Sequence, residues 1–152
     1  MSELLEKILD KRNMNEAYKK VCAKKGAGGV DGMELSELDG YIRENWDSIK
    51  EQIRKRSNKP QPVRRVEIPK PNGSKRKLGI PTVMDRVIQQ GIAQVISPMC
   101  EPLFSKCSYG FRPNRNCEMA IREMLMFLNE GYEWIVDIDL EKFFDNVPQD
   151  KL

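Results

Sequence analysis

Apolar positions in the first third of the chain recur at helical spacing in three separate stretches. Leu4 to Leu9 and Ala17 to Cys22 each form a short amphipathic pattern. A longer stripe steps by three or four residues through Leu35, Leu38, Ile42, Trp46, Ile49 and Ile53. Such spacing places the apolar side chains on one face of each helix. The pattern therefore predicts three amphipathic helices, and the long stripe is interpreted as core alone.

Residues 63–80 change to an alternating pattern that predicts a β-hairpin. Val66 and Ile68 alternate with charged residues, and the return strand carries Leu78 and Ile80. Between the two runs, residues 71–74 read Pro-Asn-Gly-Ser, a strong turn signal. Pro60 and Pro62 separate this hairpin from the preceding helix.

Two more helices and one strand are predicted in the remaining chain. A Thr82-x-x-Asp85 capping pattern opens a helix whose apolar positions run until Pro98. Asn116 caps another helix that ends at Gly131. The apolar run from Trp134 to Ile138 then predicts a buried strand that ends at Asp139. Together these elements predict an α+β fold.

Charge is distributed unevenly although the formal net charge of the 152 residues is only +3. The segment 50–77 holds eleven basic and two acidic residues, a local net charge of +9. The segment 129–152 holds seven acidic and two basic residues, a local net charge of −5. A basic arm joined to an acidic segment suits a protein that binds phosphates with one part and metal ions with the other. The alternative interpretation is that both segments are charged faces exposed to solvent.

Several chemistries are excluded by residue type. The sequence has no histidine, and its four cysteines form no Cys-x-x-Cys pair. A Cys₂His₂ zinc site and histidine-dependent triads are therefore excluded, and free thiols are expected. No apolar run approaches the length of a membrane span and no signal peptide is recognised, so we expect no membrane partner and a soluble, cytoplasmic protein.

The predicted strand at 134–139 is the strongest candidate for chemistry. It would deliver Asp139 at its end, with Phe143 and Phe144 after a short charged turn. A rigidly held carboxylate suits Mg²⁺, and an aromatic ring beside it can pack against a sugar. An aspartate that only caps the following turn is the alternative. A second candidate is a mobile loop in which Lys24 and Lys25 precede three glycines in residues 26–29.

Taken together, the sequence resembles a reverse transcriptase of the group II intron maturase type. Four blocks carry the resemblance in the order that this family uses: residues 29–32 (Gly-Val-Asp-Gly), residues 68–90 (from Ile-Pro-Lys-Pro-Asn-Gly to Gln-Gln), residues 108–115 (Ser-Tyr-Gly-Phe-Arg-Pro-Asn-Arg) and residues 137–145 (Asp-Ile-Asp-Leu-Glu-Lys-Phe-Phe-Asp). The resemblance implies helix-rich fingers with a β-hairpin, followed by the first strand of a right-hand polymerase palm.

The resemblance also implies roles at the catalytic end. Asp139 resembles the first catalytic aspartate, which would hold Mg²⁺ together with the backbone carbonyl of Leu140. Phe144 resembles the residue that packs under the incoming sugar and disfavours a 2′-hydroxyl, with Phe143 beside it mostly in the core. Lys70 and Arg76 resemble the fingers residues that hold the nucleotide triphosphate. Ordinary solvation of a hairpin is the alternative for that pair.

RNA contacts are implied for the basic residues. Lys24 and Lys25, with the glycine loop, resemble a lid over template RNA, and the basic arm adds Arg54, Lys55, Arg56, Arg64 and Arg65. Arg112 and Arg115 lie among Tyr109 and Phe111, which suits contact with the template backbone and bases. Arg112 anchoring its own loop to a carboxylate is the alternative.

The sequence also departs from the family, because no Asp-Asp pair is present. Asp137 lies too far along the strand from Asp139 to replace the missing partner. We therefore expect an N-terminal extension at 1–60, fingers at 61–131 and a truncated start of the palm at 132–152. The expected partners are intron and template RNA, with an RNA/DNA hybrid and dNTP in the complete enzyme and a possible dimer. Two functions stay open: part of an RNA-directed DNA polymerase, or an RNA-binding module without catalysis.

Overall fold

The computed structural model describes residues 2–71, 73–140, 143 and 147, which form two compact units. Unit 1 comprises residues 1–104 and unit 2 comprises residues 105–152. The boundary falls inside the region predicted as fingers, so the division into three parts stays a prediction.

Unit 1 is built on three helices that pack against one another: α1 (Glu3–Ile8), α2 (Lys11–Ala23) and α4 (Val83–Cys100). A short 3₁₀ turn, η1 (Glu101–Leu103), follows α4. Gly91 lets α2 approach α4 closely, since a Cβ there would lie 2.7 Å from the sulfur of Met14. Asn13 reinforces the contact, because its amide donates to the carbonyl of Gly91 at 3.0 Å.

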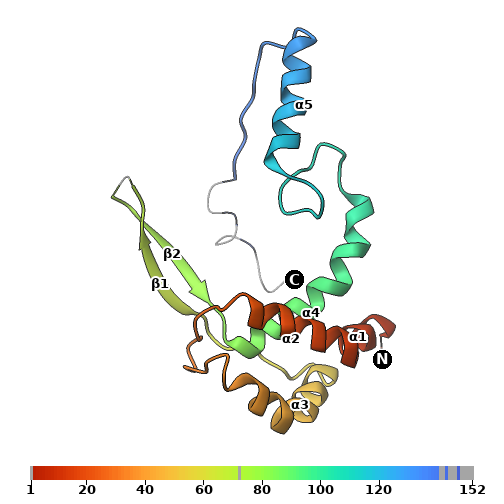
Figure 1. The fold of residues 1–152 in the computed structure, drawn as a ribbon, viewed down its shortest axis with the longest axis vertical. Coiled ribbons are helices and arrows are strands. Elements are labelled where there is room, and N and C mark those ends of the chain that lie inside the picture. The colour runs from red at the N-terminus through yellow and green to blue at the C-terminus, as the bar shows by residue number, and fades with distance from the viewer. Residues whose placement is uncertain (1, 72, 141–142, 144–146, 148–152) are drawn as a thin grey trace. The chain divides into compact units, whose positions relative to one another are not determined.

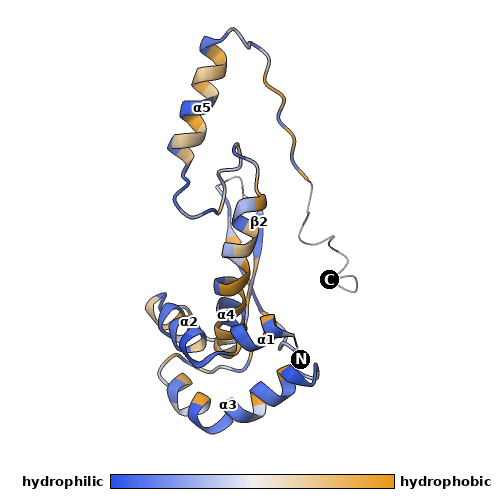
Figure 2. Cartoon of the chain, turned by 90° about the vertical axis from the view of Figure 1, so that its right-hand side faces the viewer, coloured by the Kyte–Doolittle hydropathy of each residue, from blue (hydrophilic) through white to orange (hydrophobic). Residues whose placement is uncertain are grey.

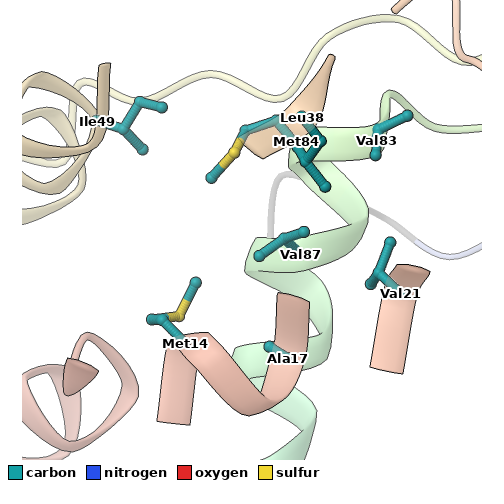
Figure 3. Packing of buried hydrophobic residues seen from close by; sticks show 8 residues of the cluster. All are labelled: Met14, Ala17, Val21, Leu38, Ile49, Val83, Met84 and Val87. Atoms are coloured by element: carbon teal, nitrogen blue, oxygen red, sulfur yellow. The ribbon is translucent and has the colours of Figure 1, made fainter. Parts of the chain in front are cut away.

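The core of unit 1 joins these helices to α3 (Leu38–Arg54). Figure 3 shows its buried side chains, which are Met14, Ala17, Val21, Leu38, Ile49, Val83, Met84 and Val87. The predicted helical stripe packs as expected, with Leu35, Ile42, Trp46 and Ile53 partly buried against this cluster. The helix itself begins at Leu38, and Leu35 lies before it.

The predicted cap of α4 is confirmed and has an additional role. The hydroxyl of Thr82 accepts the backbone N–H of Asp85 at 3.1 Å and donates to the Asp85 carboxylate at 2.7 Å. The same carboxylate accepts the backbone N–H of Gln61 at 3.0 Å, which ties the linker before the hairpin to α4. The helix continues past Pro98 to Cys100, two residues beyond the predicted end.

The predicted hairpin is confirmed as β1 (Arg64–Pro69) and β2 (Lys75–Ile80), paired antiparallel with Val66 opposite Leu78 (Figure 1). The backbone N–H of Lys70 extends the pairing by donating to the carbonyl of Ser74 at 2.7 Å. Gly73, at φ +80°, then takes the left-handed conformation that the turn requires.

Unit 2 contains helix α5 (Cys117–Asn129), which follows its predicted cap Asn116. Gly131, at φ +95°, takes the left-handed conformation two residues after the end of the helix. Figure 2 shows that hydrophobic residues occupy most of this helix, and the structure buries none of them. The predicted strand at 134–139 is not formed: residues 133–140 are exposed and carry neither helix nor strand. A strand needs a hydrogen-bonded partner, and the described residues of the chain offer this segment none.

The observed architecture is therefore α+β, helix-rich with one β-hairpin, as the sequence predicted. In the described residues no helix is long and apolar enough to cross a membrane.

Candidate nucleic-acid interface

The glycine loop after α2 is anchored to α4 by a hydrogen bond and by close packing, and its mobility stays a prediction. Arg86 of α4 donates to the carbonyl of Ala27 at 2.7 Å. Gly26 leaves room for this guanidinium, since a Cβ there would lie 2.3 Å from an Arg86 nitrogen. Gly29 is buried against the backbone of Thr82, and a Cβ there would lie 2.5 Å from the Thr82 Cα. The glycines therefore allow the loop to pack closely on the start of α4.

The two predicted lid lysines end α2 and line different cavities. Lys25 takes a left-handed conformation at φ +47° just after the helix. Together with the glycine loop it lines a cavity of about 470 Å³ in which Arg64 also takes part. Lys24 instead lines a smaller cavity of about 260 Å³ with Arg86 and two glutamines of α4. Lys25 and Arg64, which lie far apart in the sequence, thus line the same cavity.

The three basic residues at the end of α3 differ in availability. Arg54 is three-quarters buried and donates to both carboxylate oxygens of Glu6, at 3.1 and 2.8 Å, and to Glu51 at 3.1 Å. These hydrogen bonds hold the pKa of the Glu6 carboxyl below its ordinary value and raise the pKa of Arg54. Lys55 and Arg56 are exposed. Arg54 therefore joins α1 to α3, and the exposed charges at the end of this helix are those of its two neighbours.

Pairing in the hairpin sorts its side chains onto two faces. Opposite residues in an antiparallel ladder share a face, and alternation continues along each strand. Ile68 lies opposite Arg76, and by the same alternation Lys70 falls on their face at the tip. Arg65 lies on the other face together with Lys77, and there Lys75 forms an ion pair with Glu67 at 2.8 Å.

Neither Lys70 nor Arg76 takes part in a hydrogen bond or ion pair of its side chain within the residues that the structure describes. Both are exposed. Two cations on the same face near the tip of a hairpin are arranged to meet an anionic ligand from one side. The geometry is compatible with the role that the sequence predicted for them, which stays a prediction.

Unit 2 holds both predicted template-contacting arginines in internal hydrogen bonds. Arg112 donates to the carbonyls of Ser105 and Ser108 at 2.7 and 2.9 Å, and these two hydrogen bonds tie it to its own loop. Arg115 donates to the carbonyl of Lys106 at 2.9 Å, and its guanidinium lies 5.2 Å from the centre of the Tyr109 ring. Both residues shape the loop 105–116.

The predicted catalytic segment is exposed throughout its described part. Asp139 accepts the backbone N–H of Leu140 at 2.9 Å, which is a local contact within the segment. Phe143 is half-exposed, and Phe144 lies outside the described residues. Within the described part of the chain, no three Asp, Glu, Cys or His side chains group closely enough to hold a metal ion. Asp139 and Leu140 are thus adjacent, and further ligands are not brought to them here.

Two anchoring residues had not been predicted. Arg86 fixes the glycine loop, and Glu123 of α5 accepts a hydrogen bond from the Tyr109 hydroxyl and one from the Cys107 thiol at 3.5 Å. Arg86 lies within one of the quoted blocks, but its partner is 59 residues earlier in the chain. No local signal in the sequence could have paired them.

Comparison with known proteins decides the family. Residues 68–152 match the family model of the reverse transcriptase (RNA-dependent DNA polymerase). The chain belongs to the reverse transcriptase family. Reverse transcriptases work with nucleic acids and generally use a divalent metal ion.

Relatives of this chain include proteins encoded by group II introns. Over 97% of its length the chain is 34% identical to protein YkfC of Escherichia coli strain K12, of which it covers 40%. Over 86% of its length it is 36% identical to the group II intron-encoded protein LtrA of Lactococcus lactis subsp. cremoris, of which it covers 22%. It is also 34% identical, over 46% of its length, to nuclear intron maturase 1 of Arabidopsis thaliana mitochondria. The chain thus spans less than half the length of these relatives.

Proposed function

We propose that these residues form the fingers and the start of the palm of a group II intron RNA-directed DNA polymerase and maturase, and that they bind intron and template RNA. The observation that carries the RNA-binding part is the cavity in unit 1 where Lys25 and Arg64 meet the glycine loop. Both cations line this cavity together with one acidic residue, Glu34, so its lining has a net positive charge, which suits a sugar–phosphate chain. The exposed Lys55, Arg56 and Arg65 add electrostatic attraction.

The nucleotide contacts rest on the hairpin. Lys70 and Arg76 share its face at the tip, and we assign them to the triphosphate of an incoming dNTP. Phosphoryl transfer depends mainly on positioning and charge neutralisation, which two cations on one face supply. Arg54 is excluded from the RNA-binding set because its charge is engaged by Glu6 and Glu51.

The catalytic metal is proposed to be Mg²⁺, held by Asp139 and the carbonyl of Leu140. Oxygen ligands of this kind are those that Mg²⁺ prefers, and the segment around them is acidic. A bound Mg²⁺ would stabilise negative charge on the reacting phosphate. The 152 residues contain no Asp-Asp pair, so we expect them to bind RNA without synthesising DNA.

A non-catalytic RNA-binding module is the second candidate. It is favoured by the packing of unit 1, which has its own core and carries the Lys25–Arg64 cavity without contribution from residues 134–140. Primer extension separates the two candidates when the remaining part of the polymerase is supplied in trans. Restored template-dependent synthesis supports the polymerase, and RNA binding without restored synthesis supports the module.

RNA binding itself is tested by salt titration of the 152-residue chain. Affinity for single-stranded RNA should fall by orders of magnitude between about 50 and 200 mM salt, because several phosphates are neutralised. The double variant Lys25→Gln/Arg64→Gln should reduce the slope of log affinity against log salt by roughly 1.4, or about 0.7 for each lost phosphate contact.

The matched control is Arg43→Gln, which removes one positive charge from the exposed face of α3. Arg43 is paired with Asp39 and lies outside the proposed interface. This variant should leave the slope unchanged. Equal slopes for the double variant and the wild-type chain, or no salt dependence at all, would refute the assigned interface.

A further inference from the structure

The loop 105–116 of unit 2 is held in place from within. Its two arginines are fixed by backbone carbonyls of residues 105, 106 and 108, as described above. Tyr109 lies under the guanidinium of Arg115, and its hydroxyl bonds to Glu123 of α5. The loop is therefore held in a defined conformation, and one of its two aromatic side chains is left fully exposed.

That side chain is Phe111. Its relative exposure is 112%, the highest of any large apolar residue in the described chain, so the ring contacts almost nothing. Its φ is +56°, in the left-handed region that glycine adopts freely and that is a genuine outlier for a bulky residue. The backbone conformation costs free energy on folding, and the exposed ring contributes no burial to offset it. Phenylalanine at this position therefore makes no visible contribution to the stability of unit 2, and its ring is available to a ligand.

The surroundings of Phe111 indicate which ligand the ring meets. Residues 105–117 contain three basic residues and no acidic one. Glu123 of α5 bonds to Tyr109 and Cys107 of the loop, and the three basic residues of the loop exceed this one carboxylate in charge, so the loop attracts phosphates. An exposed aromatic ring in a loop of basic sequence is the combination that single-stranded nucleic acids bind, with phosphates attracted by the cations and a base stacked on the ring.

We propose that Phe111 is a base-stacking residue, which places an unpaired RNA base on its ring while Arg112 and Arg115 act as the frame that presents it. The proposal rests on the RNA binding proposed above and deepens it, because it assigns the base contact to Phe111 and not to the two arginines. Stacking needs no base-edge hydrogen bonds, so the contact is expected to tolerate any base sequence.

The test compares variants of the full 152-residue chain in binding single-stranded RNA. Phe111→Trp keeps a stacking surface and should bind as well as the wild-type chain or better. Phe111→Leu keeps an apolar side chain without a π face and should bind roughly 5- to 150-fold more weakly, the range expected for loss of one stacked base. A ligand with the same number of phosphates but without bases should bind the wild-type chain and Phe111→Leu equally.

Two further readouts keep the test independent of folding. Tryptophan fluorescence of Phe111→Trp, corrected for that of the wild-type chain, should be quenched by RNA and not by the abasic ligand. Phe111→Gly should raise the melting temperature, because glycine relieves the left-handed conformation, while it weakens RNA binding. A ring that serves internal packing would instead lower the melting temperature when removed.

The outcomes separate this proposal from the one on which it rests. If the wild-type chain binds no RNA, the proposed function fails. If it binds RNA with the expected salt dependence, but Phe111→Leu binds equally well and the abasic ligand is not discriminated against, RNA binding stands and base stacking on Phe111 is refuted.

Discussion

Replacing Gly29 by alanine tests the central feature of unit 1, the packing of the glycine loop on the start of α4. A Cβ at this position would lie 2.5 Å from the Cα and 2.7 Å from the backbone nitrogen of Thr82. Ordinary contact for a Cβ begins near 3.4 Å, so loop and helix must separate by about 0.9 Å. The obstacle is backbone, which cannot move aside as a flexible side chain can.

The magnitude follows from what that backbone holds. Thr82 caps α4 and bonds to Asp85, so its displacement disturbs the first turn of the helix. Overpacking of this kind typically costs about 1–3 kcal/mol. For a unit of this size, that corresponds to a decrease in melting temperature of roughly 4–12 °C. RNA affinity should fall as well, because the displaced loop borders the Lys25–Arg64 cavity.

The assay is thermal unfolding followed by circular dichroism, together with RNA binding at fixed salt. Gly40→Ala is the matched control, since Gly40 lies in α3 with nothing within 4 Å of its Cβ position. That substitution should stabilise the protein by up to about 1 kcal/mol through helix propensity. If Gly29→Ala melts within a degree of the wild-type chain, the close packing of the loop on α4 is refuted.

Three other predictions concern charge. Glu6→Gln should lower the free energy of unfolding at neutral pH and leave it unchanged at strongly acidic pH. The pKa of Glu6 is lowered in the folded protein, so its ion pair with Arg54 stabilises the protein above about pH 4.5 and is lost as the pH falls below that value. Urea unfolding across this pH range measures the difference, and a difference that does not change with pH would contradict the prediction. Arg56→Gly should raise the free energy of unfolding by up to about 1 kcal/mol, because Arg56 has φ +55° after α3 and glycine adopts this conformation more easily. The substitution should also remove one phosphate contact and so weaken RNA binding. A lower free energy of unfolding in the same urea assay would count against this conformation. In the complete polymerase, Asp139→Asn should abolish primer extension and leave RNA affinity nearly unchanged. Asp137→Asn should reduce primer extension far less. An equal loss of primer extension from both variants would mean that the roles along this segment are wrongly assigned.

Local patterns in the sequence predicted most of the secondary structure. Helical spacing located α2, α3, α4 and α5, because an amphipathic helix needs only its own residues to define its buried face. The capping residues Thr82 and Asn116 marked where two helices begin, since a cap acts within one turn. Turn chemistry and alternation likewise located the hairpin and its two faces.

The predicted strand at 134–139 shows where local pattern was insufficient. Its apolar run favours a buried strand, but burial and hydrogen bonding both require a second surface. In the described residues Trp134 and Ile138 are exposed, and no strand pairs with the segment. The role of Asp139 consequently stays a prediction, because a metal site depends on which ligands the fold brings to one point.

The sequence by itself determined the family, the helices, the hairpin and the segregation of charge, because each of these depends on residues that are near one another in the chain. Only the tertiary structure decided which charges are available. It showed that Arg54 is engaged by Glu6, that Arg112 and Arg115 hold their own loop, and that Lys25 lies at the same cavity as Arg64. The availability of a charged side chain depends on its partners, and partners separated by tens of residues are brought together only by folding.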